Sequence, residues 1–225
     1  MVMYYEINSL DAIRKVRPEN PKLLGEDQVG GRFLKVGART FEGTDHPFEY
    51  VDMNQGTVIM PYIGDGSELY TMLAGQFRPG PQAYILEYPG GNRDAGESGL
   101  IAVVRELGEE AGWDPRKVVA LGGEVYRDAY VEGTIESFLG LGPRGARRSQ
   151  QLGEHETIDL YVVPVRVIAP IMTRRDPEFP VSLPTQVTWL KAIQQLEATG
   201  TLPDSVRDAI HAEARRNRVF SISDL

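Results

Sequence analysis

The sequence predicts an α/β fold in which a mixed β-sheet carries helices on its faces, with an N-terminal β extension and C-terminal helices. Two observations support this prediction. Short runs of apolar, β-branched and aromatic residues recur along the first three quarters of the chain, and such runs are typical of strands. An amphipathic helical pattern interrupts them near the middle. One helix among so many strands is typical of a mixed sheet with helices packed on its faces.

The strand patterns fall into two groups. Two of them, Arg32–Phe41 and Phe48–Met53, follow a polar start and predict the N-terminal β extension. The others predict the strands of the core: Thr57–Ile63, Leu69–Phe77, Ala83–Tyr88, Val118–Tyr126, Thr134–Leu141 and Thr157–Ile168.

The clearest helix is predicted from Glu97 to Ala111. Its apolar residues recur at steps of three and four, which is the stripe of an amphipathic helix: Leu100, Val103, Val104, Leu107 and Ala111. Gly112 stands where a left-handed C-cap is expected, and Pro115 prevents the helix from resuming.

The C-terminal part is predicted to be helical. A linker rich in proline runs from Asp176 to Pro184, and helical patterns follow at Gln186–Ala198 and Ser205–Arg216, the second with Asp204 or Ser205 as its N-cap. We therefore divide the chain into an N-terminal β extension (1–54), a core (55–170), and a linker with a C-terminal helical extension (171–225).

Composition narrows the class of protein. The 225 residues, 41% hydrophobic and 25% charged, suit one domain with extensions. A formal net charge of -8 disfavours nucleic acid as the main partner, because binding its backbone requires a basic face. The absence of cysteine excludes disulfides and thiolate metal sites. We find no pattern of a signal peptide or membrane span, and we expect a cytoplasmic protein without a membrane partner.

Acidic residues on the central helix suggest a cation site. Glu106, Glu109 and Glu110 lie on one arc of the helix, because they are related by steps of three and four. Like charges at this spacing each cost a few tenths of a kcal/mol, and Gly108 inside the helix adds roughly 1 kcal/mol. A hard divalent cation would compensate, and Mg²⁺ is usual where phosphates are also bound. The ordinary alternative is a solvated acidic face.

The stretch from Gly91 to Trp113 fits the Nudix box, G-x5-E-x7-R-E-U-x-E-E-x-G-U with U apolar, at every fixed position. The chain therefore resembles the Nudix hydrolases. The resemblance implies an α/β/α sandwich in which Arg105 pairs with Glu97 and orients the glutamates. It also implies that Glu106, Glu109 and Glu110 bind Mg²⁺, with Mn²⁺ as a possible substitute, and that Arg105 and Glu109 belong to the catalytic centre.

Two flanking motifs resemble the subfamily that cleaves ADP-ribose and other nucleoside diphosphate sugars. A strand-like run enters the turn Pro89-Gly90-Gly91, and this resemblance implies that the backbone carbonyl of Gly90 binds the metal. The segment Gly75-Gln76-Phe77-Arg78 resembles a signature whose arginine contacts the diphosphate, so Arg78 is the candidate. The planar guanidinium suits phosphate oxygens, although spacing alone equally fits a surface arginine.

Candidates for the catalytic base lie before the last strand of the core. Members of this subfamily carry an acidic pair there, on a loop that supplies a glutamate as the base, and Glu154 or Glu156 would have that role here. The alternative is a pair of solvated loop carboxylates. The resemblance also implies a homodimer.

The resemblance implies Mg²⁺-dependent hydrolysis of a nucleoside diphosphate linked to a group X, either ADP-ribose or another nucleotide sugar. The products would be a nucleoside monophosphate and X-phosphate. One departure concerns the substrate: a proline usual in ADP-ribose-cleaving members is replaced in Arg127-Asp128-Ala129-Tyr130. A dinucleoside polyphosphate hydrolase is therefore an alternative, since Tyr130 falls near a tyrosine of that group. A non-catalytic Nudix domain that binds a nucleotide as a sensor is the second alternative.

Overall fold

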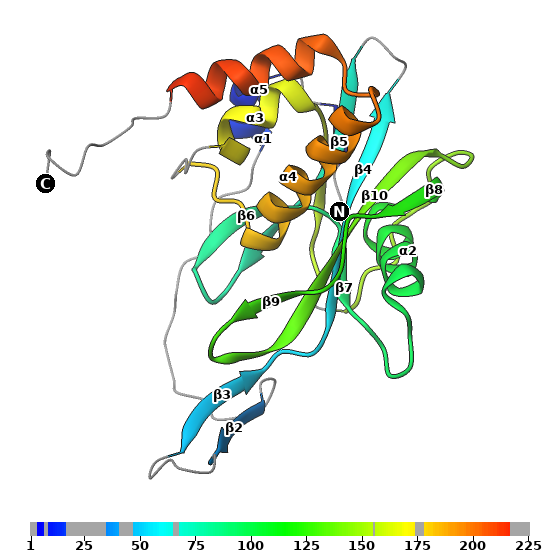
Figure 1. Ribbon diagram of the computed structural model, residues 1–225. Coiled ribbons are helices and arrows are strands. Elements are labelled where there is room, and N and C mark those ends of the chain that lie inside the picture. Colours follow the sequence, from blue (N-terminus) through cyan, green and yellow to red (C-terminus); the bar gives the residue numbers. More distant parts are fainter. Residues whose placement is uncertain are drawn as a thin grey trace, which may run out of the picture.

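The computed structural model describes residues 4–6, 9–16, 35–40, 47–64, 68–154, 156–173 and 178–216. Within these residues the predicted α/β fold is confirmed, because a mixed sheet forms the centre and helices cover both of its faces (Figure 1).

The strands pair in an order that differs from their order in the chain. Along the main path the order is β1 (Tyr4–Glu6), β11 (Asp159–Pro164), β5 (Leu69–Arg78), β4 (Gly56–Gly64), β10 (Val131–Pro143), β3 (Phe48–Asp52) and β2 (Lys35–Arg39). The remaining described strands pair at its sides: β6 (Ala83–Glu87) with β5, β7 (Gly90–Asn92) with β4, and β8 (Pro115–Ala120) and β9 (Val125–Asp128) with β10. Since β4 is parallel to β10 and antiparallel to β5, the sheet is mixed.

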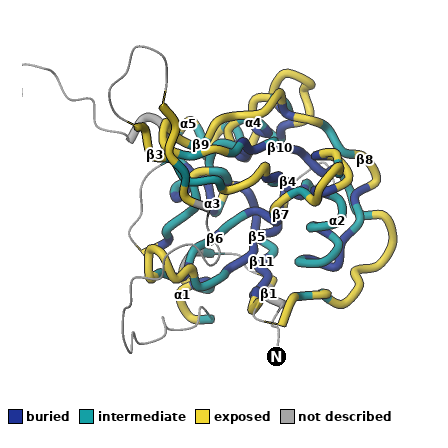
Figure 2. The backbone as a smooth tube through the Cα atoms, turned by 90° about the horizontal axis from the view of Figure 1, so that it is seen from below, coloured by how far each residue is buried: buried dark blue, intermediate teal, exposed yellow. Residues whose placement is uncertain are grey.

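Five helices in the described ranges complete the fold: α1 (Leu10–Val16), α2 (Gly99–Ala111), α3 (Val165–Thr173), α4 (Leu183–Ala198) and α5 (Asp204–Arg216). Across these ranges, the length and apolar character of the helices fall short of what a membrane span requires. Figure 2 shows that the buried stretches of β4, β5 and β10 run through the middle of the molecule, while the yellow exposed stretches lie outside.

Neighbouring residues of β4 show how the layers form. Ile59 belongs to a hydrophobic cluster with Val103 and Leu107 of α2. Met60, the next residue, belongs to a second cluster with Trp189 of α4. Successive strand residues point to opposite faces of a sheet, so α2 and α4 cover opposite faces. This is the α/β/α sandwich that the resemblance implies.

The ends of α2 follow from local sequence. Ser98 is the N-cap, and its hydroxyl accepts a hydrogen bond from the backbone N–H of Ile101 at 3.3 Å. Gly112 has φ 64°, as predicted for a left-handed C-cap, and its N–H donates to the carbonyl of Gly108 at 3.0 Å. The helix starts later than predicted, so Glu97 lies in the loop before the cap.

Two predicted strands were wrong in extent. The stretch Val118–Tyr126 is divided between β8 and β9, because Gly122, with φ 99°, and Gly123 break the extended backbone. The stretch Thr157–Ile168 contains β11 and then the start of α3, which continues past Pro170. A continuous apolar run has no clear period, so the change from strand to helix left no signal.

Smaller differences between the predicted and observed elements lie in the Pro-Gly-Gly turn, the linker and the N-terminal region. The expected Pro-Gly-Gly turn contains a short strand, β7, and α4 begins at Leu183 after the N-cap Ser182, inside the expected linker. The elements β1 and α1, which were not predicted, precede the predicted strands of the extension. Of the predicted strand Arg32–Phe41, residues 32–34 and 41 lie outside the described residues, as do residues 176–177 of the linker. The division of the chain at 54 and 170 stays a prediction.

Candidate active site

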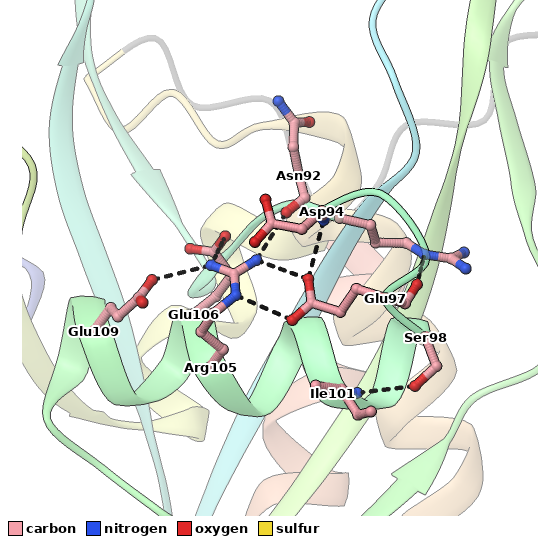
Figure 3. Close-up of polar contacts among 9 residues, drawn as sticks. Asn92, Asp94, Glu97, Ser98, Ile101, Arg105, Glu106 and Glu109 are labelled. Carbon is pink, nitrogen blue, oxygen red and sulfur yellow. Dashed lines mark hydrogen bonds and ion pairs between the residues drawn. The ribbon is translucent and has the colours of Figure 1, made fainter.

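Arg105 of α2 holds several acidic side chains together (Figure 3). Its Nε and Nη2 atoms donate to the two carboxylate oxygens of Glu97, at 3.1 and 3.0 Å. Its Nη1 donates to Glu106 at 2.8 Å and to Glu109 at 3.0 Å. The hydrogen bonds from Arg105, and then that from the backbone N–H of Asp94, lower the pKa of the Glu97 carboxyl. The ion pair that the resemblance implies is therefore present.

Two glycines allow β7 to lie against α2 and β4. A Cβ at Gly90 would lie 2.1 Å from the carbonyl oxygen of Thr57, and one at Gly91 would lie 2.4 Å from Oε1 of Glu106. Backbone leaves no room for a side chain at Gly90, whereas a side chain at Gly91 would displace the carboxylate of Glu106. The backbone N–H of Gly90 donates to Oε2 of Glu110 at 3.0 Å. Glycine at both positions thus brings backbone directly to the carboxylates of α2.

Burial disfavours the charged forms of Glu106 and Glu110 more than nearby donors and cations favour them. Burial raises the pKa of Glu110 to about 8, with the negative charges of Glu106 and Glu156 adding to the effect against the Gly90 hydrogen bond. Burial also raises the pKa of Glu106, although Arg105 opposes this. A bound cation stabilises the charged form of a buried carboxylate whose pKa is raised in this way.

These carboxylates face a large cavity. Its volume is about 810 Å³, and Glu106, Glu110, Glu156, Arg105, Arg78 and Gly90 are among the residues that line it. The structure therefore brings together most of the predicted site. It does not bring in Glu97, Glu109 or Glu154, which are absent from the cavity lining. The side chain of Glu109 is 40% exposed and turned to Arg105.

The loop before β11 is fastened to the C-terminal end of α2. The backbone N–H groups of Arg148 and Gln151 donate to the carbonyls of Gly112 at 2.7 Å and Glu109 at 2.8 Å. The side-chain amide of Gln150 donates to the carbonyls of Glu110 at 2.5 Å and Ile158 at 3.2 Å. These bonds use carbonyls that the end of a helix leaves without partners.

Within the same loop, the Glu156 side chain accepts a hydrogen bond from the backbone N–H of Gly153 at 2.9 Å. Glu156 lines the cavity, and its charge raises the pKa of both Glu106 and Glu110. Glu156 and Glu154 are both exposed, but Glu154, two residues earlier, does not line the cavity. The fastened loop thus presents only one of the two candidate bases to the carboxylates of α2.

Arg78 lies at the rim of the cavity, where it is held across neighbouring strands. Its Nε donates to Oε2 of Glu87 at 2.7 Å, and its Nη2 lies 2.6 Å from the same oxygen. The side chain of Arg78 is 44% exposed. A guanidinium anchored by one carboxylate oxygen retains donors for a further oxygen ligand.

The donor set fits a hard divalent cation completed by substrate. Among the described residues, no three His, Cys, Asp or Glu side chains form a ready ligand cluster. Mg²⁺ commonly takes one or two carboxylates and fills its other positions with water and phosphate oxygens. Glu106 and Glu110, buried beside the backbone of Gly90, correspond to that arrangement.

The family model of the NUDIX domain matches residues 53–180, more than half of the chain. The chain belongs to the Nudix family. No curated protein matches it. Among solved structures, a crystal structure of an ADP compounds hydrolase aligns with a TM-score of 0.62 at 20% identity, covering 82% of this chain and 98% of that one. At this identity the likeness concerns the fold, and it agrees with the Nudix sandwich described above.

Sequence reasoning missed several residues of the Nudix site. Glu87 was read as part of a strand, Gln150 as part of a polar loop, and Arg127 only as a departure from a motif. The cavity is lined by Arg127 and Glu87, and Gln150 supports the loop of Glu156. The positions of Arg127 and Gln150 depend on contacts between segments far apart in the chain, so no local spacing indicates them. The cross-strand pair Arg78 and Glu87 was the one foreseeable from charge.

Proposed function

We propose that this Nudix protein hydrolyses, with Mg²⁺, the diphosphate bond of a nucleoside diphosphate linked to a group X, such as ADP-ribose or another nucleotide sugar. The products are a nucleoside monophosphate and X-phosphate. One observation carries the proposal: Glu106, Glu110 and Glu156, from two distant segments, face one cavity beside the backbone of Gly90. Bound Mg²⁺ would neutralise the diphosphate and lower the pKa of a coordinated water.

Different residues would bind the cation, orient its ligands and bind the diphosphate. Glu106 and Glu110 would hold the cation together with the carbonyl of Gly90, while Arg105 fixes Glu106 and Glu109 in orientation. Glu109 would join the ligands through water or by turning away from Arg105. Arg78, anchored by Glu87, would bind an oxygen of the diphosphate.

Glu156 is our candidate for the base that removes a proton from the attacking water. It is the member of the acidic pair that lines the cavity, where it faces the carboxylates that would hold the cation. Catalysis is favoured over nucleotide sensing, since the four box glutamates and the arginine that orients them are all present. The cytoplasmic location and the homodimer stay expectations from sequence and resemblance.

The test is turnover with Mg²⁺ on ADP-ribose, other ADP-, GDP- and UDP-sugars, NADH and dinucleoside polyphosphates, with chromatographic separation of products. We expect a nucleoside monophosphate from a sugar nucleotide. Glu156→Gln should lower kcat by about 10²- to 10⁴-fold, the usual contribution of a general base, while Glu154→Gln stays within a few fold. Equal loss in the two variants would refute the assignment of the base.

Two other outcomes would change the function itself. Cleavage restricted to dinucleoside polyphosphates would favour the alternative activity. Measurable nucleotide binding without Mg²⁺-dependent turnover would favour a sensor.

A further inference from the structure

Arg127, on β9, differs from the other arginines near the cavity. Arg105 and Arg78 are paired with glutamates, and Arg93 donates to Glu124 at 3.0 Å. The Nε of Arg127 is buried and has no hydrogen-bond partner among the described residues. Burial lowers the pKa of its guanidinium. The side chain is half-buried, and a partly desolvated guanidinium that lacks an ion pair among the described residues is stabilised by an anionic ligand.

The backbone around Arg127 aims its side chain into the cavity. The pairing of β9 with β10 shifts register between Val131 and Thr134, the stretch of β10 beside Arg127. Such bulges redirect side chains and are common next to active sites. Arg127 accordingly lines the large cavity that contains the carboxylates. It also lines a smaller, mainly apolar cavity of about 270 Å³ between β9 and the start of α4.

A glycine makes room for the guanidinium. A Cβ at Gly56 would lie 2.7 Å from Nη2 of Arg127 and 3.4 Å from the carbonyl oxygen of Gly91. Gly91 is the residue that lies against the carboxylate of Glu106. Arg127 and the carboxylates of α2 therefore line the same cavity, and Gly91 of β7 lies near both groups.

We propose that Arg127 binds a phosphate oxygen of the substrate in this cavity, in addition to the oxygen bound by Arg78. This inference rests on the proposed function, which supplies a diphosphate. The guanidinium provides several donors in a plane that matches a phosphate group, and a phosphate supplies the counter-charge that the protein lacks there. The adjoining apolar cavity then receives the part of the substrate attached to that phosphate.

The first experiment measures binding of inorganic pyrophosphate, in the presence of Mg²⁺, by titration calorimetry. Arg127→Gln should weaken binding by about 10- to 100-fold, as expected for the loss of charge-assisted hydrogen bonds. Arg127→Lys should fall between this variant and the wild type, because it keeps the charge without the planar fork. Arg116→Gln removes the same charge from an exposed position on β8 and should bind as the wild type does.

A second variant moves the guanidinium without removing it. Gly56→Ala would place a methyl group where Nη2 lies and push the flexible end of Arg127 aside. It should weaken pyrophosphate binding in the same direction as Arg127→Gln. Thermal unfolding separates a ligand site from a structural role: Arg127→Gln should leave the Tm of the free protein unchanged or higher, because it removes a half-buried charge whose Nε has no hydrogen-bond partner among the described residues.

Wild-type protein that does not bind pyrophosphate would overturn the inference, as would Arg127→Gln protein that binds it as tightly as the wild type. A marked fall in Tm of Arg127→Gln would do the same, by assigning Arg127 to the fold. The proposed function fails on a different result, the absence of Mg²⁺-dependent nucleoside monophosphate from every sugar nucleotide tested. Binding and turnover therefore report on the two proposals separately.

Discussion

Glu97 and Glu110 belong to the same short motif, yet their surroundings act on them in opposite directions. Glu97 accepts two hydrogen bonds from Arg105 and one from the backbone N–H of Asp94, and its pKa is lowered. Glu110 receives one backbone N–H, from Gly90, and burial raises its pKa to about 8. The charge of Glu97 is therefore balanced within the protein by Arg105, whereas the charge of Glu110 would be stabilised by a bound cation.

The strongest test of this comparison is Glu110→Gln, which keeps the shape of the side chain and removes its charge. We expect activity to fall by more than about 100-fold, beyond the usual loss for a residue that only supports a metal ligand. The metal-free protein should be as stable as the wild type or more so, because a buried charge is removed. Mg²⁺-dependent assays and thermal unfolding in EDTA measure both effects. An active variant would end the assignment of Glu110 to the metal.

Arg105→Ala tests the opposite side of the comparison. It removes the partner of Glu97, Glu106 and Glu109 together, so both activity and stability should fall. We expect a loss of roughly 1–3 kcal/mol in the free energy of unfolding, moderate because the side chains are partly exposed and solvent screens them. Urea unfolding measures it. A variant with unchanged stability would show that this network contributes nothing to the fold.

Per pH unit, the smallest expected effect is the pH dependence of stability without metal. The folded pKa of Glu110, about 8, lies above the ordinary 4.5, so between these values the folded protein keeps a proton that the unfolded chain has lost. The free energy of unfolding should therefore decrease as pH rises from about 5 to 8, by at most ~1.4 kcal/mol per unit. Glu110→Gln should flatten the slope, whereas Glu197→Gln, exposed on α4, should not. Identical slopes in all three proteins would contradict the raised pKa.

The sequence was most informative where one regular element determines the geometry. The step of four residues places Glu106 and Glu110 on one side of α2, and Gly112 ends the helix as predicted. Helical periodicity does not determine rotamers, however. Glu109 lies at an equivalent step and turns to Arg105, because the nearest cation is there. The sequence therefore predicted which carboxylates share a surface, but not which of them face the cavity.

The sequence was least informative where distant segments meet. Arg127 reaches the cavity through a bulge in the pairing of β9 and β10 and through the space left by Gly56. The acidic pair before β11 could not be separated by spacing, since its placement depends on how the loop is fastened to α2. The limit of the strand Thr157–Ile168 was missed because a buried strand and a buried helix are both continuously apolar.

The amide of Gln150 bonds to α2 on one side and to the residue before β11 on the other, so the stretch that bears Glu156 is a short loop closed at both ends. A short closed loop has few conformations to lose when a substrate arrives. If Glu156 acts as the proposed base, much of the entropy of ordering the backbone that bears it would be lost during folding and not in every catalytic cycle. An enzyme built in this way would hold its base in position between turnovers, and its rate would not depend on closure of this loop.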